Sequence, residues 1–391
     1  MTAVQARGAG RGLLRAGGLA VGLGTATVVG ALVEAHAFRL VTHAVTLPQT
    51  PVEPVGTAVR MPVEPVEAAL AGALSATSTG VTDPGTTRRL RILHLSDLHY
   101  VPGQLDKLRF LSGLDDLAPD LVICTGDLLS DDAGIDELTG ALAGLLRRPG
   151  AFVFGSNDYF GPRPGNPLRY LVPHERTLDG ARALDWRTLR DVLAGAGWAD
   201  LHNRRAAIAT VGIRLELRGT GDAHIDLDDY AQVAGPAASG IDLVLGVTHA
   251  PYRRVLDAMV HDGLPLILAG HTHGGQVCLP GWGALVSNCD LPPKLASGLH
   301  WYAPEHTPVS LRRAQEPLGG GAGTHRTPGE RAEAASGAAA IAPGDPQVSA
   351  GLTNGAWLHV SAGLGTSPYA PFRLFCRPEA CLLDVAIEDA G

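Results

Sequence analysis

The sequence predicts an α/β domain in which several apolar strands end in side chains that can bind metal ions. Five apolar runs fit this scheme, and each passes directly into Asp, Asn or His residues: residues 90–99, 120–127, 151–158, 241–249 and 264–273. In open α/β sheets, functional sites assemble at the carboxyl ends of the strands. The side chains that follow these five runs are therefore expected to converge on one crevice.

The first three runs end in carboxylate, imidazole or amide groups. Asp97 and His99 close the first run, Asp127 follows a glycine after the second, and Asn157 and Asp158 follow the third. A single Asp after a strand is most often a helix cap or a turn residue. Its recurrence at successive strand ends favours a shared site instead.

The last two runs end in imidazoles. His249 ends the fourth run, and the tetrapeptide 270–273, which contains His271 and His273, follows the fifth. Side chains two residues apart in an extended segment point to the same face. Gly270 and Gly274 allow the backbone to turn at this point, so we expect both imidazoles to reach neighbouring metal ions.

In this order, the blocks resemble the signature of the calcineurin-like metallophosphoesterase superfamily, which is D-x-H, G-D, G-N-H-[DE], H and G-H-x-H. The resemblance spans about residues 90–390. The stretches 270–280 and 360–378 look most like the bacterial branch that includes the phosphodiesterases YaeI and YkuE. The resemblance implies a four-layer α/β/β/α sandwich with a site for two metal ions.

The resemblance also implies which side chains hold the two divalent ions. The expected ligands of the first ion are Asp97, His99 and His273. Those of the second ion are Asn157, His249 and His271, with Asp127 between the two ions. Oxygen and imidazole ligands without a thiolate favour Mn²⁺, Fe or Zn²⁺, and Mn²⁺ is the ion that we expect. The residues expected to act in catalysis are Asp127, Asn157, Asp158 and His249.

One block departs from the signature. The family has Asn and then His after the glycine, whereas Ser156 and Asn157 stand here in an ungapped alignment. Either Asn157 takes the ligand position and Asp158 replaces the acid-like His, or Ser156 is a weak ligand and Asn157 stands in place of the His. We favour the first interpretation, because an amide oxygen is a better metal ligand than an un-ionised hydroxyl.

Several neighbouring residues are weaker candidates for the site. His94 lies inside the first strand and is expected to pack in the core or to support a ligand, and Thr248 and Thr272 lie beside ligands that they could orient. A Pro- and Gly-rich loop adds groups that could grip a phosphate, namely Arg163, Arg169 and Tyr170.

The N-terminal segment predicts a membrane anchor. Residues 16–33 carry no charge, three arginines precede them, and Glu34 ends the run. A bilayer span needs about 20 mainly apolar residues, and the positive flank would keep the N-terminus inside and the catalytic domain outside the cytoplasm. A cleaved signal peptide with a secreted enzyme, or an apolar tail on a cytoplasmic enzyme, are the alternatives.

Composition predicts how the chain is divided into segments. Residues 1–47 would form the anchor and a lead-in strand, and residues 89–391 the metallophosphoesterase domain. The stretches 48–88 and 314–350 are rich in Pro, Gly and Ala and are expected to be a disordered linker and a disordered insertion. The formal charge of −8 argues against duplex nucleic acid as a partner, and no protein partner is predicted.

Hydrophobic periodicity predicts further helices and strands, and the spacing of the cysteines bears on metal binding and disulfide formation. Residues 188–196 and 252–261 have helical spacing, and the strand-like runs 207–217, 356–360 and 380–387 are expected to pair in a second sheet. The five cysteines lack a C-x-x-C motif, which makes a structural zinc site unlikely. Cys376 and Cys381 either pair outside the cytoplasm or stay reduced.

These observations together predict an enzyme. By resemblance, it hydrolyses a phosphodiester or pyrophosphate bond, and a lipid-linked substrate such as a UDP-2,3-diacylglucosamine-like pyrophosphate or a phospholipid is plausible. Two alternatives stay open. One is a catalytically impaired protein that binds metal and recognises a phosphorylated ligand, and the other is a soluble nucleotide phosphodiesterase.

Overall fold

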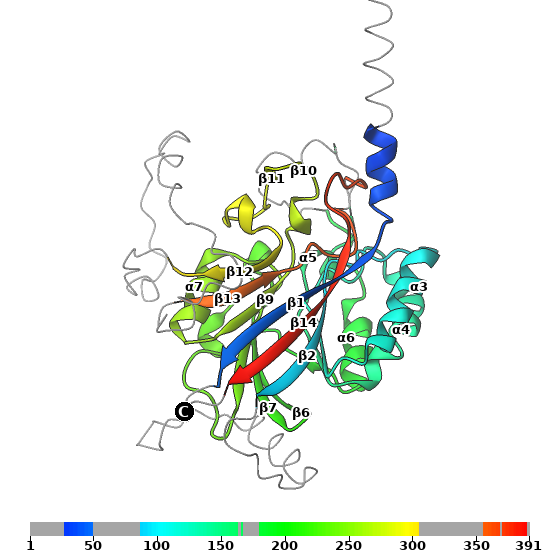
Figure 1. The fold of residues 1–391 in the computed structure, drawn as a ribbon. Coiled ribbons are helices and arrows are strands. Elements are labelled where there is room, and N and C mark those ends of the chain that lie inside the picture. The colour runs from blue at the N-terminus through cyan, green and yellow to red at the C-terminus, as the bar shows by residue number, and fades with distance from the viewer. Residues whose placement is uncertain are drawn as a thin grey trace, which may run out of the picture.

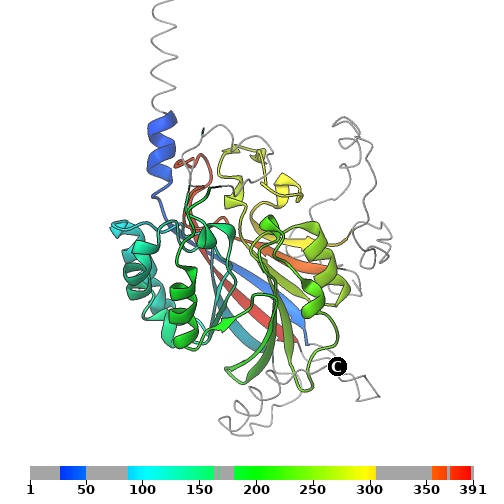
Figure 2. The same ribbon diagram turned by 180° about the vertical axis from the view of Figure 1, so that it is seen from behind.

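The computed structural model describes residues 27–49, 87–162, 166, 180–304, 355–367 and 370–388. In these ranges, two six-stranded sheets pack face to face, and helices cover the outer face of each sheet (Figure 1 and Figure 2). The mixed α/β fold and the four-layer order expected from the sequence are therefore present.

The first sheet is mostly parallel at its centre. Its strands lie in the order β1 (Arg39–Pro48), β14 (Glu379–Glu388), β2 (Arg88–Leu95), β3 (Leu121–Cys124), β4 (Gly150–Phe152) and β5 (Ala199–Asp200). The neighbours from β2 to β5 all pair in parallel. The carboxyl ends of β2, β3 and β4 therefore meet at one edge.

The second sheet repeats this plan. Its order is β12 (Gly298–Tyr302), β13 (Ala356–Val360), β9 (Leu266–Ala269), β8 (Leu243–Val247), β7 (Ile213–Gly219) and β6 (Arg205–Thr210). The strands from β13 to β7 pair in parallel. A short hairpin of β10 (Cys278–Leu279) and β11 (Gly283–Ala284) extends from the end of the molecule where β9 finishes.

Alternation of side chains along the strands separates three apolar layers. In β2, Leu93 and Leu95 face the helices α3 (Leu105–Gly113), α4 (Ile135–Ala141) and α6 (Trp186–Gly195). Ile92, one position away, faces the second sheet instead and packs in the central core. The helix α7 (Arg253–His261) covers the outer face of the second sheet. The helices predicted at 188–196 and 252–261 are confirmed as α6 and α7.

The C-terminal strand corrects one expectation. Residues 380–387 were expected in the second sheet, but β14 lies in the first sheet, parallel to β1 and antiparallel to β2. The apolar side chains of β14 are buried on both faces, with Leu382 toward the helices and Leu383 toward the central core. An apolar run of this kind fits the interior of either sheet, so its pattern does not identify its neighbours. The run 207–217 is the β6–β7 hairpin, which turns at Val211 and Gly212 with positive φ.

The expected membrane anchor is described only from residue 27 onward. Residues 27–34 are helical and stand at one end of the molecule (Figure 1). Within the ranges that the structure describes, no helix combines the length and apolar character needed to cross a bilayer. Residues 16–26, most of the linker 48–88 and the insertion 314–350 lie outside the described residues.

Candidate metal centre

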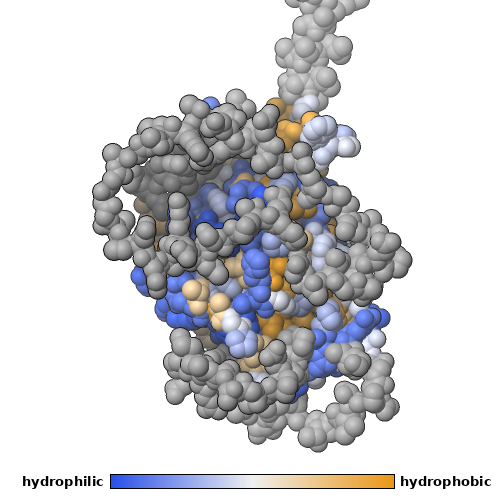
Figure 3. Space-filling model, turned by 90° about the vertical axis from the view of Figure 1, so that its left-hand side faces the viewer, coloured by the Kyte–Doolittle hydropathy of each residue, from blue (hydrophilic) through white to orange (hydrophobic). Residues whose placement is uncertain are grey.

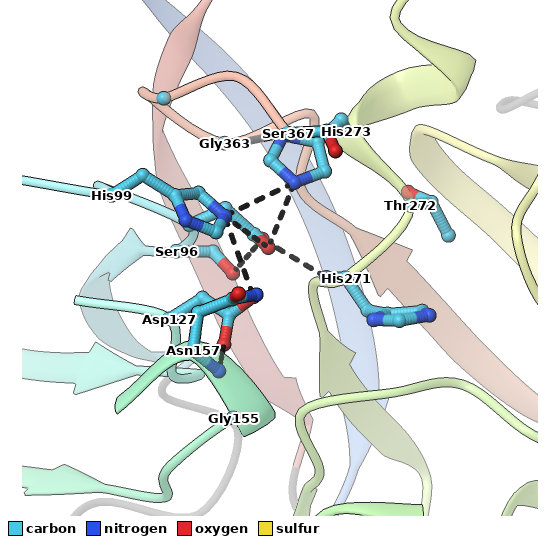
Figure 4. A network of polar contacts seen from close by, with 12 residues as sticks. Ser96, His99, Asp127, Gly155, Asn157, His271, Thr272, His273, Gly363 and Ser367 are labelled. Atoms are coloured by element: carbon cyan, nitrogen blue, oxygen red, sulfur yellow. Dashed lines mark hydrogen bonds and ion pairs between the residues drawn. The ribbon is translucent and has the colours of Figure 1, made fainter. Parts of the chain in front are cut away.

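The candidate centre lies where β2, β3, β4, β8 and β9 end, as the strand-end argument predicts. Figure 4 shows His99, His273, Asp127 and Asn157 directed toward one another from different elements. The backbone at this edge adopts a conformation that is uncommon for residues other than glycine. Positive φ angles of 43–70° occur at Asp97, His99, Asp127, His271 and His273. Backbone strain concentrated in this way is typical of functional sites.

The first cluster joins the end of β2 to the end of β9. Asp97, His99 and His273 are buried, and each offers one ligand atom within 4.8 Å of the other two. The Nε2 atoms of His99 and His273 lie 3.2 Å apart, and His273 Nε2 lies 3.6 Å from Asp97 Oδ1. Asp97 Oδ1 is buried without a hydrogen-bond partner. An acceptor left in this way is costly unless a cation completes it.

The second cluster places Asp127 between the two groups of imidazoles. Asp127 Oδ2 lies 3.4 Å from His99 Nε2 and 3.5 Å from His249 Nε2. His249 Nδ1 lies 2.6 Å from the carbonyl oxygen of Thr125, to which it donates, so Nε2 is the nitrogen that faces the centre. His249 Nε2 is buried without a hydrogen-bond partner. Asp97, Asp127 and His249 thus form a second set of ligand atoms that fits a metal ion.

His271 approaches the centre in a different way. Its backbone N–H donates to Asp97 Oδ2 at 2.9 Å, and its ring lies 5.2 Å from that of His249, centroid to centroid. Its Nε2 faces the carbonyl oxygen of Asn288 at 3.2 Å, which leaves Nδ1 as the nitrogen that could bind a metal. His271 belongs to neither of the two clusters of described residues.

Asn157 lies beside the central carboxylate. Its Nδ2 donates to Asp127 Oδ2 at 2.6 Å, and its backbone N–H donates to Asp127 Oδ1 at 2.8 Å. It occupies the short helix α5 (Ser156–Tyr159) that starts after β4. A Cβ on Gly155 would lie 2.3 Å from Asp127 Oδ1, so only glycine fits this approach. Asn157 therefore lies next to the central carboxylate, and its place at the ligand position, instead of Ser156, stays a prediction.

The comparison with known proteins agrees with this geometry. A family model described as calcineurin-like phosphoesterase matches residues 90–275, which include all seven expected ligands. The chain contains a calcineurin-like metallophosphoesterase domain. Metallophosphoesterases hold divalent metals at a dinuclear site, and the two clusters of buried ligand atoms fit such a site.

Three curated relatives match the metallophosphoesterase domain over about half of this chain. The uncharacterized metallophosphoesterase YkoQ of Bacillus subtilis is 28% identical over 49% of this chain and 64% of its own length. The phosphodiesterase YaeI of Escherichia coli is 30% identical over 49% and 63%. A bovine protein (Bos taurus), named transmembrane protein with metallophosphoesterase domain, is 26% identical over 50% and 42%. Each match thus spans less than two thirds of the relative.

Asp158 does not take the position of an acid in this metallophosphoesterase site. Its two carboxylate oxygens accept four backbone N–H bonds of 2.7–3.0 Å, from Gly155, Asp127, Leu128 and Leu129. Burial, together with the neighbouring Asp127 carboxylate, raises the pKa of Asp158 to about 7. The acceptor atoms are nevertheless all used by the backbone. The expectation that Asp158 replaces the family's His is therefore wrong: Asp158 holds the loop that carries Asp127.

A buried polar network supports the ligand loops from below. Ser96 donates to Asp97 Oδ2 at 2.5 Å and accepts from Thr125, which in turn contacts His94 Nε2 at 2.8 Å. Burial lowers the pKa of His94 to about 3, so its ring stays neutral, in the supporting position that the sequence suggested. Thr272 donates to the carbonyl oxygen of Ala296 and therefore fixes the backbone of the loop.

The electrostatics of the imidazoles differ sharply. Burial disfavours a charge on His249, but the carboxylates of Asp127 and Asp222 outweigh it and raise the pKa of His249 well above 6.5. Burial lowers the pKa of His271 and His273 well below 6.5. His271 and His273 are therefore neutral and ready to bind a metal, whereas His249 must first lose a proton.

The structure adds two residues that the sequence reasoning missed. Asp222 follows β7 at the same sheet edge and is fully buried, and His224 lies two residues further along. The His224 ring lies 4.4 Å from that of His271, and its Nδ1 lies 3.0 Å from the Tyr252 hydroxyl. The pair Gly221-Asp222, which follows β7, repeats the pattern of Gly126-Asp127 after β3 and could have been recognised. The loop residues Arg163, Arg169 and Tyr170 lie outside the described residues.

Proposed function

We propose that this domain hydrolyses a phosphodiester or pyrophosphate bond at a dinuclear metal site. The observation that carries the proposal is the convergence of buried carboxylate and imidazole atoms from Asp97, Asp127 and His249 within 4.8 Å of one another. The names of the relatives support the reaction class, because YaeI is named a phosphodiesterase and YkoQ a metallophosphoesterase.

In this proposal the ligands divide into two sets. Asp97, His99 and His273 hold one ion, and the second set comprises Asn157, His249 and His271. Asp127 would serve both sets, because a carboxylate has two oxygens that can each bind a metal ion. Two bound divalent ions would activate a water molecule and neutralise the charge that develops on the phosphoryl oxygens. The imidazoles favour Mn²⁺, Fe or Zn²⁺ over Mg²⁺ and Ca²⁺.

The leaving oxygen needs a hydrogen-bond donor. Asp158 cannot be that donor, because both of its carboxylate oxygens are engaged by the backbone. His224 is the candidate, since it is half-buried beside His271 and its orientation is fixed by the Tyr252 hydroxyl. In the proposed reaction, His224 donates a hydrogen bond to the oxygen that leaves phosphorus. The loop after β7 would thus supply the group that the block 155–158 lacks.

Replacing His224 by asparagine is expected to slow esters with poor leaving groups much more than esters with good ones. Proton assistance to a leaving oxygen is typically worth about 10²–10⁴-fold, and p-nitrophenolate needs little of it. We therefore expect kcat for a phenyl ester to fall by about 10²-fold, with little change for the p-nitrophenyl ester. Tyr252→Phe should give a smaller loss of the same kind. An equal loss for both esters would contradict the assignment.

Metal removal tests the proposed function directly. Protein stripped with a chelator should lose hydrolysis of bis-p-nitrophenyl phosphate, and Mn²⁺ should restore it. Because the pKa of His249 is raised whereas those of His271 and His273 are lowered, His249 should release a proton as metal binds. Metal affinity should then fall by about tenfold per pH unit in acid, since one pKa unit corresponds to about 1.4 kcal/mol. Calorimetry in buffers of different ionisation enthalpy counts the released protons, and a count of zero would contradict the raised pKa of His249.

The substrate is proposed to be a diester or pyrophosphate with a lipid-like substituent. A cleft of about 480 Å³ backs onto the Asp97–His99 loop, and apolar residues such as Phe38, Leu105 and Leu364 line it together with Arg109 and Lys107. Lys107 donates to the carbonyl oxygen of Leu98 inside that loop. Asp106 also lines this cleft and pairs with Arg109 at 2.9 Å, so the apolar walls are the feature that suits a hydrocarbon substituent.

We also propose that residues 16–33 attach the protein to the cell membrane, with the catalytic domain outside the cytoplasm. The uncharged run behind three arginines supports this location, and one relative is named a transmembrane protein. Fractionation of the full-length chain after an alkaline wash tests the attachment. Recovery in the soluble fraction would favour the secreted or cytoplasmic alternative.

A second candidate is a metal-binding protein that recognises a phosphorylated ligand without turnover. It is favoured by the lack of the family's His in the block 155–158 and by the engagement of Asp158 with the backbone. The two candidates differ in one measurement. An enzyme loses its hydrolysis of bis-p-nitrophenyl phosphate when Asp127 is replaced by asparagine, whereas a binding protein has no rate to lose.

A further inference from the structure

We propose that the end of the molecule carrying the metal centre docks onto a lipid bilayer through an apolar rim. The rim comprises Val28, Val29 and Val33 of the helical residues 27–34, Phe375 of the C-terminal loop, and Trp282 at the tip of the β10–β11 hairpin. The inference extends the proposed function, because it places the reaction at the membrane surface, but its test does not depend on hydrolysis.

The side chains of the rim are unusually exposed for their type. Trp282 is 80% exposed, Val33 65%, and Val28 and Phe375 61% each. Single exposed apolar residues are common on protein surfaces, but contiguous groups of them mark binding surfaces. These residues therefore indicate a binding surface only if they lie next to one another.

Hydrogen bonds join the three segments of the rim side by side. Phe375 N–H donates to Glu34 Oε2 at 2.9 Å, and Arg373 N–H donates to the carbonyl oxygen of Ala31 at 3.0 Å. On the other side, Cys278 N–H donates to the carbonyl oxygen of Leu374 at 2.9 Å. The loop 373–375 thus lies between the helical residues 27–34 and the hairpin, and both flanking segments stand at the same end in Figure 1 and Figure 2.

The same contacts connect the rim to the metal centre. The hairpin begins five residues after His273, and the Cys376 thiol donates to the carbonyl oxygen of His273. Arg373 also donates to that carbonyl oxygen, from a fully buried side chain. A bilayer against the rim would therefore lie on the side of the molecule where the ligand loops are, within reach of a lipid-borne phosphate ester.

The chemistry of the rim favours a bilayer as its occupant. Val28, Val29 and Val33 belong to the C-terminal part of the uncharged run 16–33, so the rim includes the end of an apolar segment of the chain. Tryptophan prefers the boundary between headgroups and acyl chains. Glu34 accepts a hydrogen bond from Phe375, while Arg377 binds the carbonyl oxygen of Ala37 and presents a cation beside the rim, as anionic headgroups require. Apolar side chains edged by a cation are typical of interfacial binding.

The space-filling view includes part of the apolar rim. Figure 3 shows apolar colour at the base of the helical segment, close to the top of the molecule, and again over part of the middle, among hydrophilic side chains. The opposite end carries one exposed apolar residue at the β6–β7 turn, Val211, which is 58% exposed. Val211 therefore offers a matched position that should stay in water.

Fluorescence quenching by brominated lipid tests the inference with the full-length chain. The protein is mixed with vesicles of phosphatidylglycerol and phosphatidylcholine, with or without brominated acyl chains. The chain has five tryptophans, so the contribution of Trp282 is the difference between wild type and Trp282→Phe. We expect brominated lipid to quench this difference signal and plain lipid to shift it to the blue.

The control places a tryptophan at the other end. In the Trp282→Phe background, Val211→Trp should add emission that brominated lipid leaves unchanged. Equal quenching at both positions, or none at Trp282, would overturn the proposal. A Trp282 that is unquenched by lipid but shielded from aqueous iodide would assign the rim to a protein partner and would also overturn it. None of these outcomes depends on phosphoesterase activity, so this test and the metal test fail separately.

Discussion

Asp127→Asn is expected to lower kcat/KM for bis-p-nitrophenyl phosphate by at least about 10²–10³-fold, the loss that follows removal of one group stabilising the transition state. The reason is the position of Asp127, whose Oδ2 lies 3.4 Å from His99 Nε2 and 3.5 Å from His249 Nε2. An asparagine has only one side-chain oxygen and no charge, so it cannot serve both ions. Metal content should fall together with the rate.

The fold should survive this substitution. The backbone N–H of Asn157 can still donate to the remaining oxygen at position 127, and the loop is held separately by Asp158. Asp116→Asn, at an exposed position on the helical side of the first sheet, is the matched control and should leave both rate and metal content unchanged. Unaltered hydrolysis by Asp127→Asn would refute the enzyme proposal, because no reaction at this centre can bypass its central carboxylate.

Much of the centre could be predicted from sequence because its geometry follows from chain topology. Asp97, Asp127 and His249 each follow an apolar run; parallel pairing aligns the strand ends within each sheet, and the packing of the two sheets brings both sets of ends together. The convergence of these three residues can therefore be predicted without knowing any side-chain contact. The same reasoning applied to β7 would have added Asp222.

The remaining features depend on contacts between distant residues. Asp158 looks like a free carboxylate in sequence, and only the direction of its side chain shows that four backbone N–H groups occupy it. His224 has no strand-end position of its own, and its relevance comes from a ring 4.4 Å away on another loop. The position of strand β14 could not be predicted from sequence either, because a run buried on both faces fits the interior of either sheet.

Asp158→Ala is expected to destabilise the domain by about 3 kcal/mol or more, because each buried N–H group left without an acceptor costs about 1–3 kcal/mol. Four such groups depend on this one carboxylate, and three of them belong to the loop at Asp127, Leu128 and Leu129. For a domain of this size, such a loss lowers Tm on the order of 10 °C. Thermal unfolding of the variant beside Asp136→Ala, an exposed position on α4, measures the effect.

The metal content of the Asp158 variants separates a structural role from a chemical one. If Asp158 holds the loop, Asp158→Asn should also lose stability, since its amide group would direct two donors at backbone N–H groups that are donors themselves. Metal affinity should fall with Tm, because Asp127 shifts when its own N–H loses Asp158 Oδ2, which lies 2.7 Å away. A proton-donating Asp158 would behave differently: kcat would fall while Tm and metal content stayed at wild-type values. That result would restore Asp158 to the reaction and remove the need for His224.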